Sequence, residues 1–403
     1  MRNPRSLGHA LIIGALIGLG AALIFTAGFF FRDLVGMAFP TAFAASANAD
    51  SDYPLLKEVQ ILLNHHYLRE QPEYTQRQYA AIRGVLTTLE DRYTFFIDPP
   101  VAQSESDALA GTYGGIGVQV NRNEAGQFVL FPFEDSPAAA AGIEDGDVLV
   151  AVNNEPIDLS TPQDTVNQML RGEVKPGNGV ELTLQKSTGD SQTVFIEFAV
   201  INVPSVVWRV LSEDDTIGYV QIIRFTSRTP EELETALQEM DAAGVGGLIL
   251  DLRNNSGGLL QESVEVASQF LDDGQIIVYE RSNKSERAFH AQAGGLAVDI
   301  PLVVLVNQGT ASASELVAGA VQDHERAVLI GQKTFGKGTV QQIFRLSDNS
   351  SVHITSAEWL TPDYRRLEGV GLEPDITMIP DVNGRDVELG EAIRYLQQHY
   401  DLR

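Results

Sequence analysis

The stretch PLVVLVNQGTASASELVAGAVQDHERAVLIGQKTFGKGTVQ, residues 301–341, decides the fold of this chain. Residues 301–306 are an uninterrupted apolar run, which predicts a buried strand, and a helical pattern of apolar residues begins near Ser312. Polar residues and a glycine at 307–309 separate the two elements. The small hydroxyl of Ser312 therefore lies at the junction between a strand and a helix. The first N–H groups of a helix have no partner within the helix, so they can stabilise a negative charge that develops on a bound carbonyl.

Ser312 has a structural and a chemical interpretation. Together with Glu315 it spells S-x-x-E, a capping box, in which the serine satisfies a helix amide and the glutamate reaches back. The local pattern alone favours this cap. However, Lys337 stands between two glycines before a β-rich segment, and a lysine held in an apolar site loses its proton more easily and can act as general base to a serine. Gln341, on the same face of an extended strand, could orient that lysine.

Two other sites are disfavoured by the same stretch. Residues 331–337 spell G-x-x-x-x-G-K, but Gly338 occupies the position of the magnesium-binding Ser or Thr of a P-loop, and a strand pattern rather than a helix follows. A serine triad that uses His324 is disfavoured as well, because the interval from Ser312 along one helix is roughly 18 Å, well beyond hydrogen-bond reach.

The segment NQGTASASELVAGAVQDHERAVLIGQKTFGKGTVQ, residues 307–341, resembles the signature of the carboxy-terminal processing peptidases, or tail-specific proteases. These are serine endopeptidases with a Ser/Lys dyad. The resemblance implies that Ser312 is the nucleophile, Lys337 the general base and Gln341 a supporting residue. Spacing alone does not distinguish Ser312 from the hydroxyls two positions to either side. The family usually has serine where this chain has Thr310, a departure that leaves the nucleophile unchanged.

Composition limits the classes of function. The chain has 403 residues, 44% of them hydrophobic, which suggests about two or three domains with their own cores. Its net charge of -26 argues against nucleic acid or an anionic surface as a partner. With no cysteine, there is no disulfide framework, thiolate site or cysteine-bound zinc. No H-E-x-x-H or calcium-loop motif is present, so we expect neither a metal nor another cofactor.

The N-terminus predicts a membrane anchor. Residues 10–31 carry no charge, follow Arg2 and Arg5, and are long enough to cross a bilayer with the basic end in the cytoplasm. We interpret them as a single-pass signal anchor in the cell membrane. The alternative is a cleaved signal, because residues 47–49 have the small-x-small form of a cleavage site, and would give a secreted or periplasmic protein. Both interpretations place the remainder outside the cytoplasm.

The region 51–104 predicts helices. Apolar residues at helical spacing indicate two or more amphipathic helices, ended by Asp98-Pro99-Pro100. The region resembles the N-terminal helical region of the family. We expect this region to pack against the rest of the chain or to form a dimer contact. A homo-oligomer is therefore one of the two interpretations.

Two motifs between 105 and 200 together resemble a bacterial PDZ domain, namely GGIGVQV at 114–120 and DSPAAAAGIEDGDVL at 135–149. Successive amides at Gly115, Ile116 and Gly117 could bind a terminal carboxylate while a peptide adds as a β-strand to an open sheet edge. The implied partners are proteins or peptides with free C-termini.

Arg171 also falls in this region. It corresponds to an arginine thought in some relatives to couple the position of the PDZ domain to the active site, and an ordinary surface arginine is the equally open alternative.

Strands predicted at 217–225 and 247–252 flank a helix predicted at 230–243, which indicates an α/β core. The second strand leads into DLRNNSGG, whose glycines allow the backbone to approach a ligand closely. The resemblance implies a crotonase-like protease core in which Gly258 and Ala313 supply the oxyanion amides. Farther on, two strands around 339–360 predict a hairpin, and residues 387–398 a closing amphipathic helix.

We therefore predict an α/β (α+β) protein in five parts. They are a cytoplasmic stub, anchor and linker at 1–50, a helical region at 51–104, a PDZ domain at 105–200, a serine protease core at 201–380 and a C-terminal helix at 381–403. The predicted function is a serine endopeptidase that recognises protein C-termini and cleaves through an acyl-enzyme. A PDZ scaffold on an inactive core is the alternative; an acyl-CoA enzyme is disfavoured by the PDZ insertion and the anchor.

Overall fold

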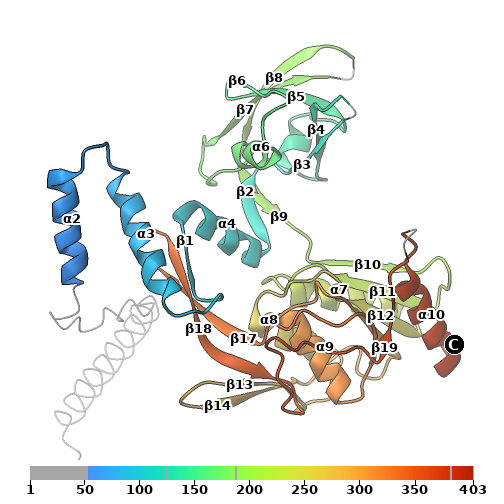
Figure 1. The fold of residues 1–403 in the computed structure, drawn as a ribbon. Coiled ribbons are helices and arrows are strands. Elements are labelled where there is room, and N and C mark those ends of the chain that lie inside the picture. Colours follow the sequence, from blue (N-terminus) through green and yellow to red (C-terminus); the bar gives the residue numbers. More distant parts are fainter. Residues whose placement is uncertain (1–52, 124, 187, 382–383, 403) are drawn as a thin grey trace, which may run out of the picture. The chain divides into compact units, whose positions relative to one another are not determined.

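The computed structural model describes residues 53–402, apart from 124, 187, 382 and 383 (Figure 1). The expected anchor at 10–31 and the alternative cleavage site at 47–49 lie outside the described residues. Within the described part of the chain, no helix has both the length and the apolar character needed to cross a membrane. The chain divides into two compact units, Met1–Tyr74 and Thr75–Arg403.

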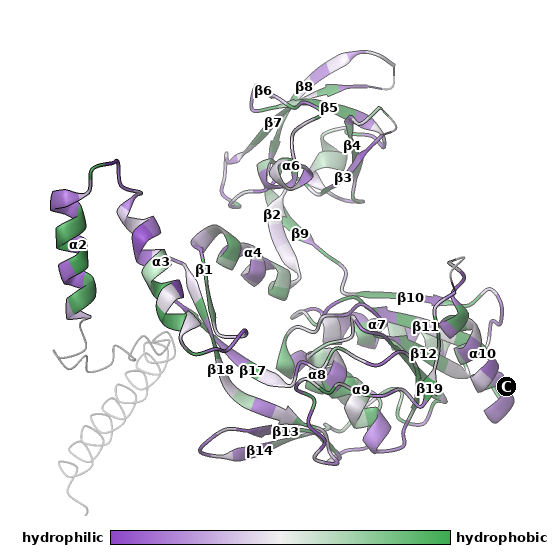
Figure 2. Cartoon of the chain, viewed as in Figure 1, coloured by the Kyte–Doolittle hydropathy of each residue, from purple (hydrophilic) through white to green (hydrophobic). Residues whose placement is uncertain are grey.

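Helix α2 (Pro54–His66) is the helix described in the first unit, and it begins with the proline that suits the first turn of a helix. None of its residues is buried, and Leu55, Val59 and Leu62 are at least half exposed. Figure 2 shows apolar residues, in green, along this helix. The predicted amphipathic helix is confirmed, and its role in a dimer contact stays a prediction.

Helix α3 (Tyr74–Thr87) and strand β1 (Phe95–Ile97) precede a helix that the sequence analysis did not predict. The prolines expected to end the helical region instead open α4 (Pro99–Ala110). That prediction was wrong because proline, with its fixed φ and no N–H, is tolerated in the first turn of a helix. Gly111, at φ 69°, ends α4 in the left-handed conformation.

The region that resembles a PDZ domain forms its own sheet and core. Its sheet has the strand order β3-β4-β5-β7-β8, with β6 beside β5, and a separate ribbon pairs β2 with β9. The elements are β2 (Thr112–Gly115), β3 (Val118–Arg122), β4 (Phe128–Pro132), α5 (Pro137–Ala140), β5 (Asp147–Val152), β6 (Glu155–Pro156), α6 (Gln163–Met169), β7 (Gly179–Gln185), β8 (Ser191–Glu197) and β9 (Ala199–Asn202). Alternate residues of β7, Val180, Leu182 and Leu184, are fully buried in the core.

The predicted α/β core contains a six-stranded sheet in the order β10-β11-β12-β15-β16-β19, parallel except for β10 (Figure 1). Its elements are β10 (Val206–Val210), β11 (Ile217–Ile222), α7 (Thr229–Ala242), β12 (Gly247–Asp251), α8 (Leu260–Ser268), β15 (Leu302–Val306), α9 (Ala313–Asp323), β16 (Val328–Gly331), β19 (Ile376–Thr377) and α10 (Val387–His399). The predicted strand at 217–225 is shorter than expected, whereas the closing helix matches its prediction within one residue.

Alternation along the central strands separates two hydrophobic cores. In β12, Leu248 and Leu250 pack with α7, α8 and α9, whereas Ile249 faces α10. Strand β15 alternates in the same way, with Val304 in the first core and Val303 in the second. Both strands are buried on both faces and are apolar up to Asp251 at the end of β12, as is typical of parallel strands covered by helices.

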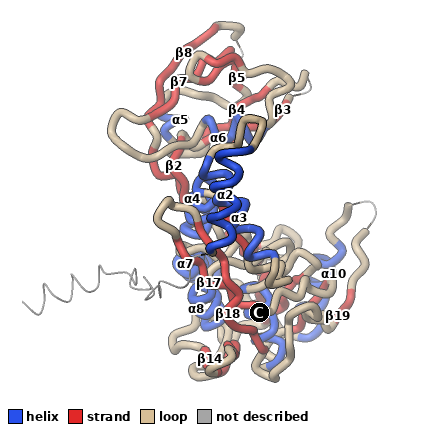
Figure 3. Tube along the Cα trace, turned by 60° about the vertical axis from the view of Figure 1, so that its left-hand side comes forward, coloured by secondary structure: helices blue, strands red, loops and turns tan. Residues whose placement is uncertain are grey.

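A second sheet contains the predicted hairpin, β17 (Thr339–Arg345) and β18 (Ser351–Leu360), which Figure 3 shows as long red strands. Strands β13 (Ile276–Arg281) and β14 (Glu286–His290) extend it beside β18. Strand β1 also pairs with β18, Phe95 opposite His353. The segment just before α4 therefore belongs to the same sheet as the hairpin that follows Lys337.

A buried charge network joins the end of β12 to α10. The Asp251 carboxylate is fully buried, accepts from the Tyr219 hydroxyl at 2.7 Å and pairs with the Arg253 guanidinium at 2.6 Å. Arg253 also donates to both oxygens of Asp386 at 2.7 and 2.8 Å, and Asp386 is the N-cap of α10. Burial together with the Asp251 charge raises the pKa of the Tyr219 hydroxyl. The network fixes the loop that follows β12.

We predict that Asp251→Ala lowers the free energy of unfolding by about 1–3 kcal/mol, because it leaves the Tyr219 hydroxyl without its acceptor and removes the buried one of the Arg253 partners, while Asp386 remains. Chemical denaturation followed by circular dichroism measures this loss. Asp241→Ala, on an exposed position of α7, is the matched control and should change stability little. Equal stability of the two variants would contradict a structural role for the network.

Candidate active site

The candidate site lies where two neighbouring parallel strands end. Strands β12 and β15 pair in parallel, Asp251 beside Leu305, so the loops that follow them emerge at the same edge of the sheet. The loops are bound to each other. The Asn254 N–H donates to the Asn307 side-chain oxygen at 2.9 Å, and the Ala311 N–H donates to the Asn255 carbonyl at 2.9 Å.

Ser312 occupies a sharp turn between the second loop and α9. Its backbone lies at φ 57° and ψ -121°, outside the regions that L-residues favour. Such a conformation costs on the order of 1–3 kcal/mol and is kept only where the surroundings enforce it. The serine side chain is partly exposed, whereas Ala311 and Ala313 on either side are buried. The turn therefore presents one hydroxyl at the surface of the core.

The two neighbouring hydroxyls are engaged elsewhere. Thr310 Oγ1 donates to the Leu252 carbonyl at 2.9 Å, and Ser314 Oγ donates to the Asn255 carbonyl at 2.9 Å. Both residues are fully buried. The structure thus distinguishes Ser312 from its neighbours, which sequence spacing could not do.

Two glycines let the first loop come close to this serine. A Cβ atom on Gly257, at φ 98°, would lie 2.8 Å from Ser312 Cβ and 3.0 Å from the Ala313 nitrogen. A Cβ atom on Gly258, at φ 151°, would lie 1.9 Å from the Phe225 carbonyl oxygen. Only glycine therefore fits at either position, and the backbone of this loop passes directly beside Ser312 and the first amide of α9.

Asn255 was missed by the sequence analysis. It is fully buried, its side-chain amide donates to the Ile222 carbonyl at 2.8 Å, and its side-chain oxygen accepts the Gly257 N–H at 2.9 Å. Asn255 thereby holds the glycine loop, while its own carbonyl accepts from both Ala311 and Ser314. An asparagine in a loop gives no sequence signal of this role, because its partners lie on distant segments.

Lys337 is half-buried, and its ammonium nitrogen donates to Gln341 Oε1 at 2.8 Å. The Gln341 amide nitrogen donates to the Tyr93 carbonyl, which turns the glutamine oxygen toward the lysine. The Tyr93 ring also faces the lysine, with its centroid 5.5 Å from Nζ. The structure therefore brings Lys337 and Gln341 together, and adds Tyr93 from the N-terminal region as a residue that orients them.

The charge state of Lys337 reflects opposing effects. Burial lowers its pKa, because the ammonium loses solvation. The nearby carboxylates of Glu105 and Glu368 oppose that change, and the Arg224 guanidinium adds to it. The net result is a pKa below the ordinary lysine value, as a general base requires.

Glu315 connects the two halves of the site. It is fully buried, and its Oε2 accepts the backbone N–H groups of both Ser312 and Lys337, each at 2.9 Å. Because both bonds end on the same oxygen, the backbone nitrogens of Ser312 and Lys337 lie no farther apart than the sum of the two bond lengths. Oε1 accepts the Gly336 N–H at 2.8 Å and the Thr334 hydroxyl at 2.5 Å. The sequence predicted only the hydrogen bond between the Glu315 side chain and the Ser312 backbone. The hydrogen bonds of Glu315 to Gly336 and Lys337 could not be predicted, because they depend on the tertiary structure.

Other residues singled out by sequence lie in ordinary structural roles. The His324 ring nitrogen Nε2 contacts the Ile276 carbonyl oxygen at 2.7 Å. The Arg171 guanidinium stacks on the Tyr113 ring, 4.2 Å from its centroid. The role of Arg171 in coupling the PDZ domain to the site stays a prediction.

The expected carboxylate-binding loop is partly occupied by the chain itself. The Ile116 N–H donates to the Leu170 carbonyl at 3.3 Å, and Gly115 bridges to Arg171. The Ile116 side chain is fully buried in the domain core. Gly117, at φ 75°, has no room for a side chain against Ser136. The loop has the predicted glycine geometry, but the Ile116 amide is already bonded and Gly115 lies in the β2–β9 ladder, opposite Ala199.

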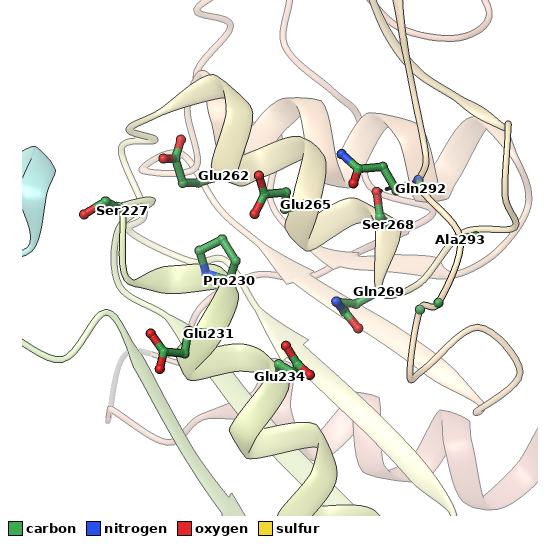
Figure 4. A pocket seen from close by; sticks show the side chains of 12 residues that line it. Ser227, Pro230, Glu231, Glu234, Glu262, Glu265, Ser268, Gln269, Gln292 and Ala293 are labelled. Carbon is green, nitrogen blue, oxygen red and sulfur yellow. Dashed lines mark hydrogen bonds between the residues drawn. The ribbon is translucent and has the colours of Figure 1, made fainter. Parts of the chain in front are cut away.

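A separate cavity of about 400 Å³ lies between α7 and α8. Figure 4 shows four carboxylates around it, Glu231 and Glu234 from α7 and Glu262 and Glu265 from α8. Burial raises the pKa of Glu262. Among the described residues no three metal-ligating side chains converge, here or elsewhere. None of the residues discussed above as candidate catalytic groups lines this cavity.

Comparison with known proteins agrees with this geometry. Residues 216–378 match the model of peptidase family S41, and residues 134–175 match that of the PDZ domain. A carboxy-terminal-processing protease of Bartonella bacilliformis is 36% identical over 322 residues, which span 77% of this chain and 73% of that protein. The chain belongs to peptidase family S41. The resemblance stated from the sequence is confirmed.

Two further comparisons extend this result. A carboxyl-terminal-processing protease of Synechocystis is 34% identical over 322 residues, 78% of this chain and 74% of that protein. A solved structure assigned to the S41 proteases, from Bacteroides fragilis, aligns over 83% of this chain and 93% of its own chain, with 16% sequence identity and a TM-score of 0.51. At this identity the similarity supports the fold alone. This S41 peptidase is thus a serine-type, carboxy-terminal-processing protease with a mixed α/β fold and a PDZ domain.

We predict that Glu315→Gln lowers kcat of the S41 peptidase by roughly 100-fold or more, because small displacements of reacting groups have effects of this size. The glutamine side chain has only one acceptor oxygen, whereas the glutamate has two. It therefore cannot accept from the N–H groups of Ser312 and Lys337 and also from the Gly336 N–H and the Thr334 hydroxyl. Peptide hydrolysis measures the loss. Glu325→Gln, on an exposed residue just beyond α9, is the control. Wild-type turnover in Glu315→Gln would contradict the connecting role.

We predict that kcat/KM rises with pH along a limb whose midpoint lies below the ordinary lysine pKa of about 10.4. The reason is that burial lowers the pKa of Lys337, so the neutral amine accumulates at lower pH. Glu105→Gln removes a negative charge that raises this pKa and should move the limb to lower pH. A pH–rate profile on a short peptide tests both statements. An unmoved limb, or one that moves to higher pH, would argue against Lys337 as the group that titrates.

Proposed function

We propose that the S41 peptidase cleaves peptide bonds through a Ser312/Lys337 dyad and an acyl-enzyme. The observation that carries the proposal is the single Glu315 oxygen that accepts the backbone N–H groups of both residues. Their segments lie far apart in sequence, and this bond makes their backbones neighbours. The partly exposed hydroxyl and the lysine with lowered pKa have the properties of a nucleophile and a base.

The chemical steps follow from these properties. Neutral Lys337 takes the Ser312 proton as Oγ bonds to the scissile carbonyl carbon, and the ammonium then gives that proton to the leaving amine as the C–N bond breaks. Water, deprotonated by the same lysine, hydrolyses the acyl-enzyme and regenerates the serine. Gln341 accepts from Nζ at 2.8 Å and so fixes the position of the amine in the resting arrangement.

The carbonyl oxygen gains negative charge in these steps and needs N–H donors. We assign this role to the Ala313 amide, the first of α9, and to the Gly258 amide. The Gly257 N–H is already bound to Asn255, which makes the next amide of the loop the available donor. The close approach of Gly257 to Ser312 and Ala313 brings this loop beside the nucleophile.

We further propose that the PDZ domain binds the free C-termini of protein substrates at the loop Gly115, Ile116 and Gly117. The match to a PDZ model and the glycine geometry of the loop support this assignment. Residues 10–31 would tether the enzyme to the membrane, with the catalytic part outside the cytoplasm.

The decisive experiment compares Ser312→Ala, Lys337→Ala and Lys337→Arg with the wild type. We expect all three to lose turnover of a peptide substrate, the arginine variant included, because guanidinium keeps its proton near neutral pH. Mass spectrometry of the wild type mixed with an activated ester should detect an acyl adduct on Ser312. Substantial turnover by Lys337→Arg would contradict the base assignment, and turnover without an acyl adduct on Ser312 would contradict the acyl-enzyme.

A further inference from the structure

The PDZ strand β3 lies at an end of its sheet. In the order β3-β4-β5-β7-β8 it pairs with β4, Val118 opposite Pro132 and Val120 opposite Leu130. Backbone groups that face one side of a strand belong to every second residue. The side of β3 away from β4 is therefore the edge to which an incoming peptide strand would add.

Gln163, the first residue of α6, occupies this edge. Its side-chain amide nitrogen donates to the Val120 carbonyl at 2.6 Å. The bond shows that the Val120 carbonyl points away from β4, toward α6. By the same alternation, the backbone groups of Val118 and Arg122 face that side too. The acceptor that a peptide N–H would use is thus already taken by a side chain.

The other end of α6 closes the carboxylate loop. Leu170, which follows the last residue of the helix, accepts the Ile116 N–H through its carbonyl at 3.3 Å. The pocket between α6 and the loop measures about 20 Å³, room for about one water molecule. It is too small for the side chain of a peptide's last residue. Both ends of α6 are therefore bonded to groups that a bound tail would need.

We propose that the tail groove of the S41 peptidase is closed by its own α6, and that Gln163 is the residue a substrate tail must displace to bind. The inference rests on the proposed recognition of C-termini. A tail would exchange the Gln163 amide for its own backbone N–H at Val120, and its carboxylate would replace the Leu170 carbonyl at Ile116.

The lining of this space indicates which end of a tail it would bind. Its exposed surface is more polar than apolar, and Arg171 lies beside Ile116 and Leu170 in the lining. Arg171 therefore adds a positive charge for the carboxylate of a tail.

The test measures binding of a fluorescein-labelled decapeptide with a free C-terminal valine to the full chain, in a Ser312→Ala background that prevents cleavage. Fluorescence anisotropy gives the Kd, and the same peptide with an amidated C-terminus reports on carboxylate recognition. We expect Gln163→Ala to tighten binding of the free acid roughly 3- to 10-fold, the range for one competing hydrogen bond. Gln163→Glu, which cannot donate to a carbonyl, should tighten it too.

Gln168→Ala is the matched control, because Gln168 is an exposed glutamine on the same helix. It should bind like the parent. If both Gln163 variants bind the free acid no better than the parent while the amidated peptide still binds more weakly, the closure by Gln163 is wrong and tail recognition stands. If no variant distinguishes the acid from the amide, tail recognition itself fails, and this inference fails with it.

Discussion

The active site depends on one buried carboxylate. Glu315 lies at the start of α9 with no exposure to solvent, where an uncompensated charge would be costly. Three backbone N–H groups and one hydroxyl satisfy it, and the positive end of the helix favours its charge. Two of those N–H groups belong to Ser312 and Lys337. The charge is therefore stable only when the serine turn and the lysine loop are both in place, which couples folding of the site to folding of the core.

The sheet explains why these loops meet. Strands β12 and β15 are parallel neighbours buried between two cores, so both loops emerge at one edge, where ligands bind in open α/β sheets. The Arg253 network fixes the first loop from the side of α10, and Asn255 fixes it from the side of Ser312. The PDZ domain shows the opposite arrangement, since its own helix is bonded to the strand edge and the loop that a ligand would need. The S41 peptidase thus combines an active site whose segments are already bonded together with a PDZ groove that is occupied by its own helix α6.

Sequence reasoning succeeded where periodicity is strong. The apolar runs of β12 and β15, the hairpin after Lys337 and the helix α10 were all predicted, because a strand buried on both faces and an amphipathic helix have distinct patterns. It failed at Pro99, where the same residue type can end one helix or begin the next. It also did not predict that the Ile116 side chain belongs to the PDZ core.

The sequence by itself determined the family, the PDZ domain before the protease core, and the candidate serine and lysine, because these depend on motifs that are contiguous in the chain. Only the tertiary structure decided which of three nearby hydroxyls is accessible, since Thr310 and Ser314 are excluded by bonds to carbonyls on another segment. It also decided that Glu315, Asn255 and Tyr93 take part in the site. Hydrogen bonds between distant segments leave no local pattern, so their partners appear only when the chain has folded.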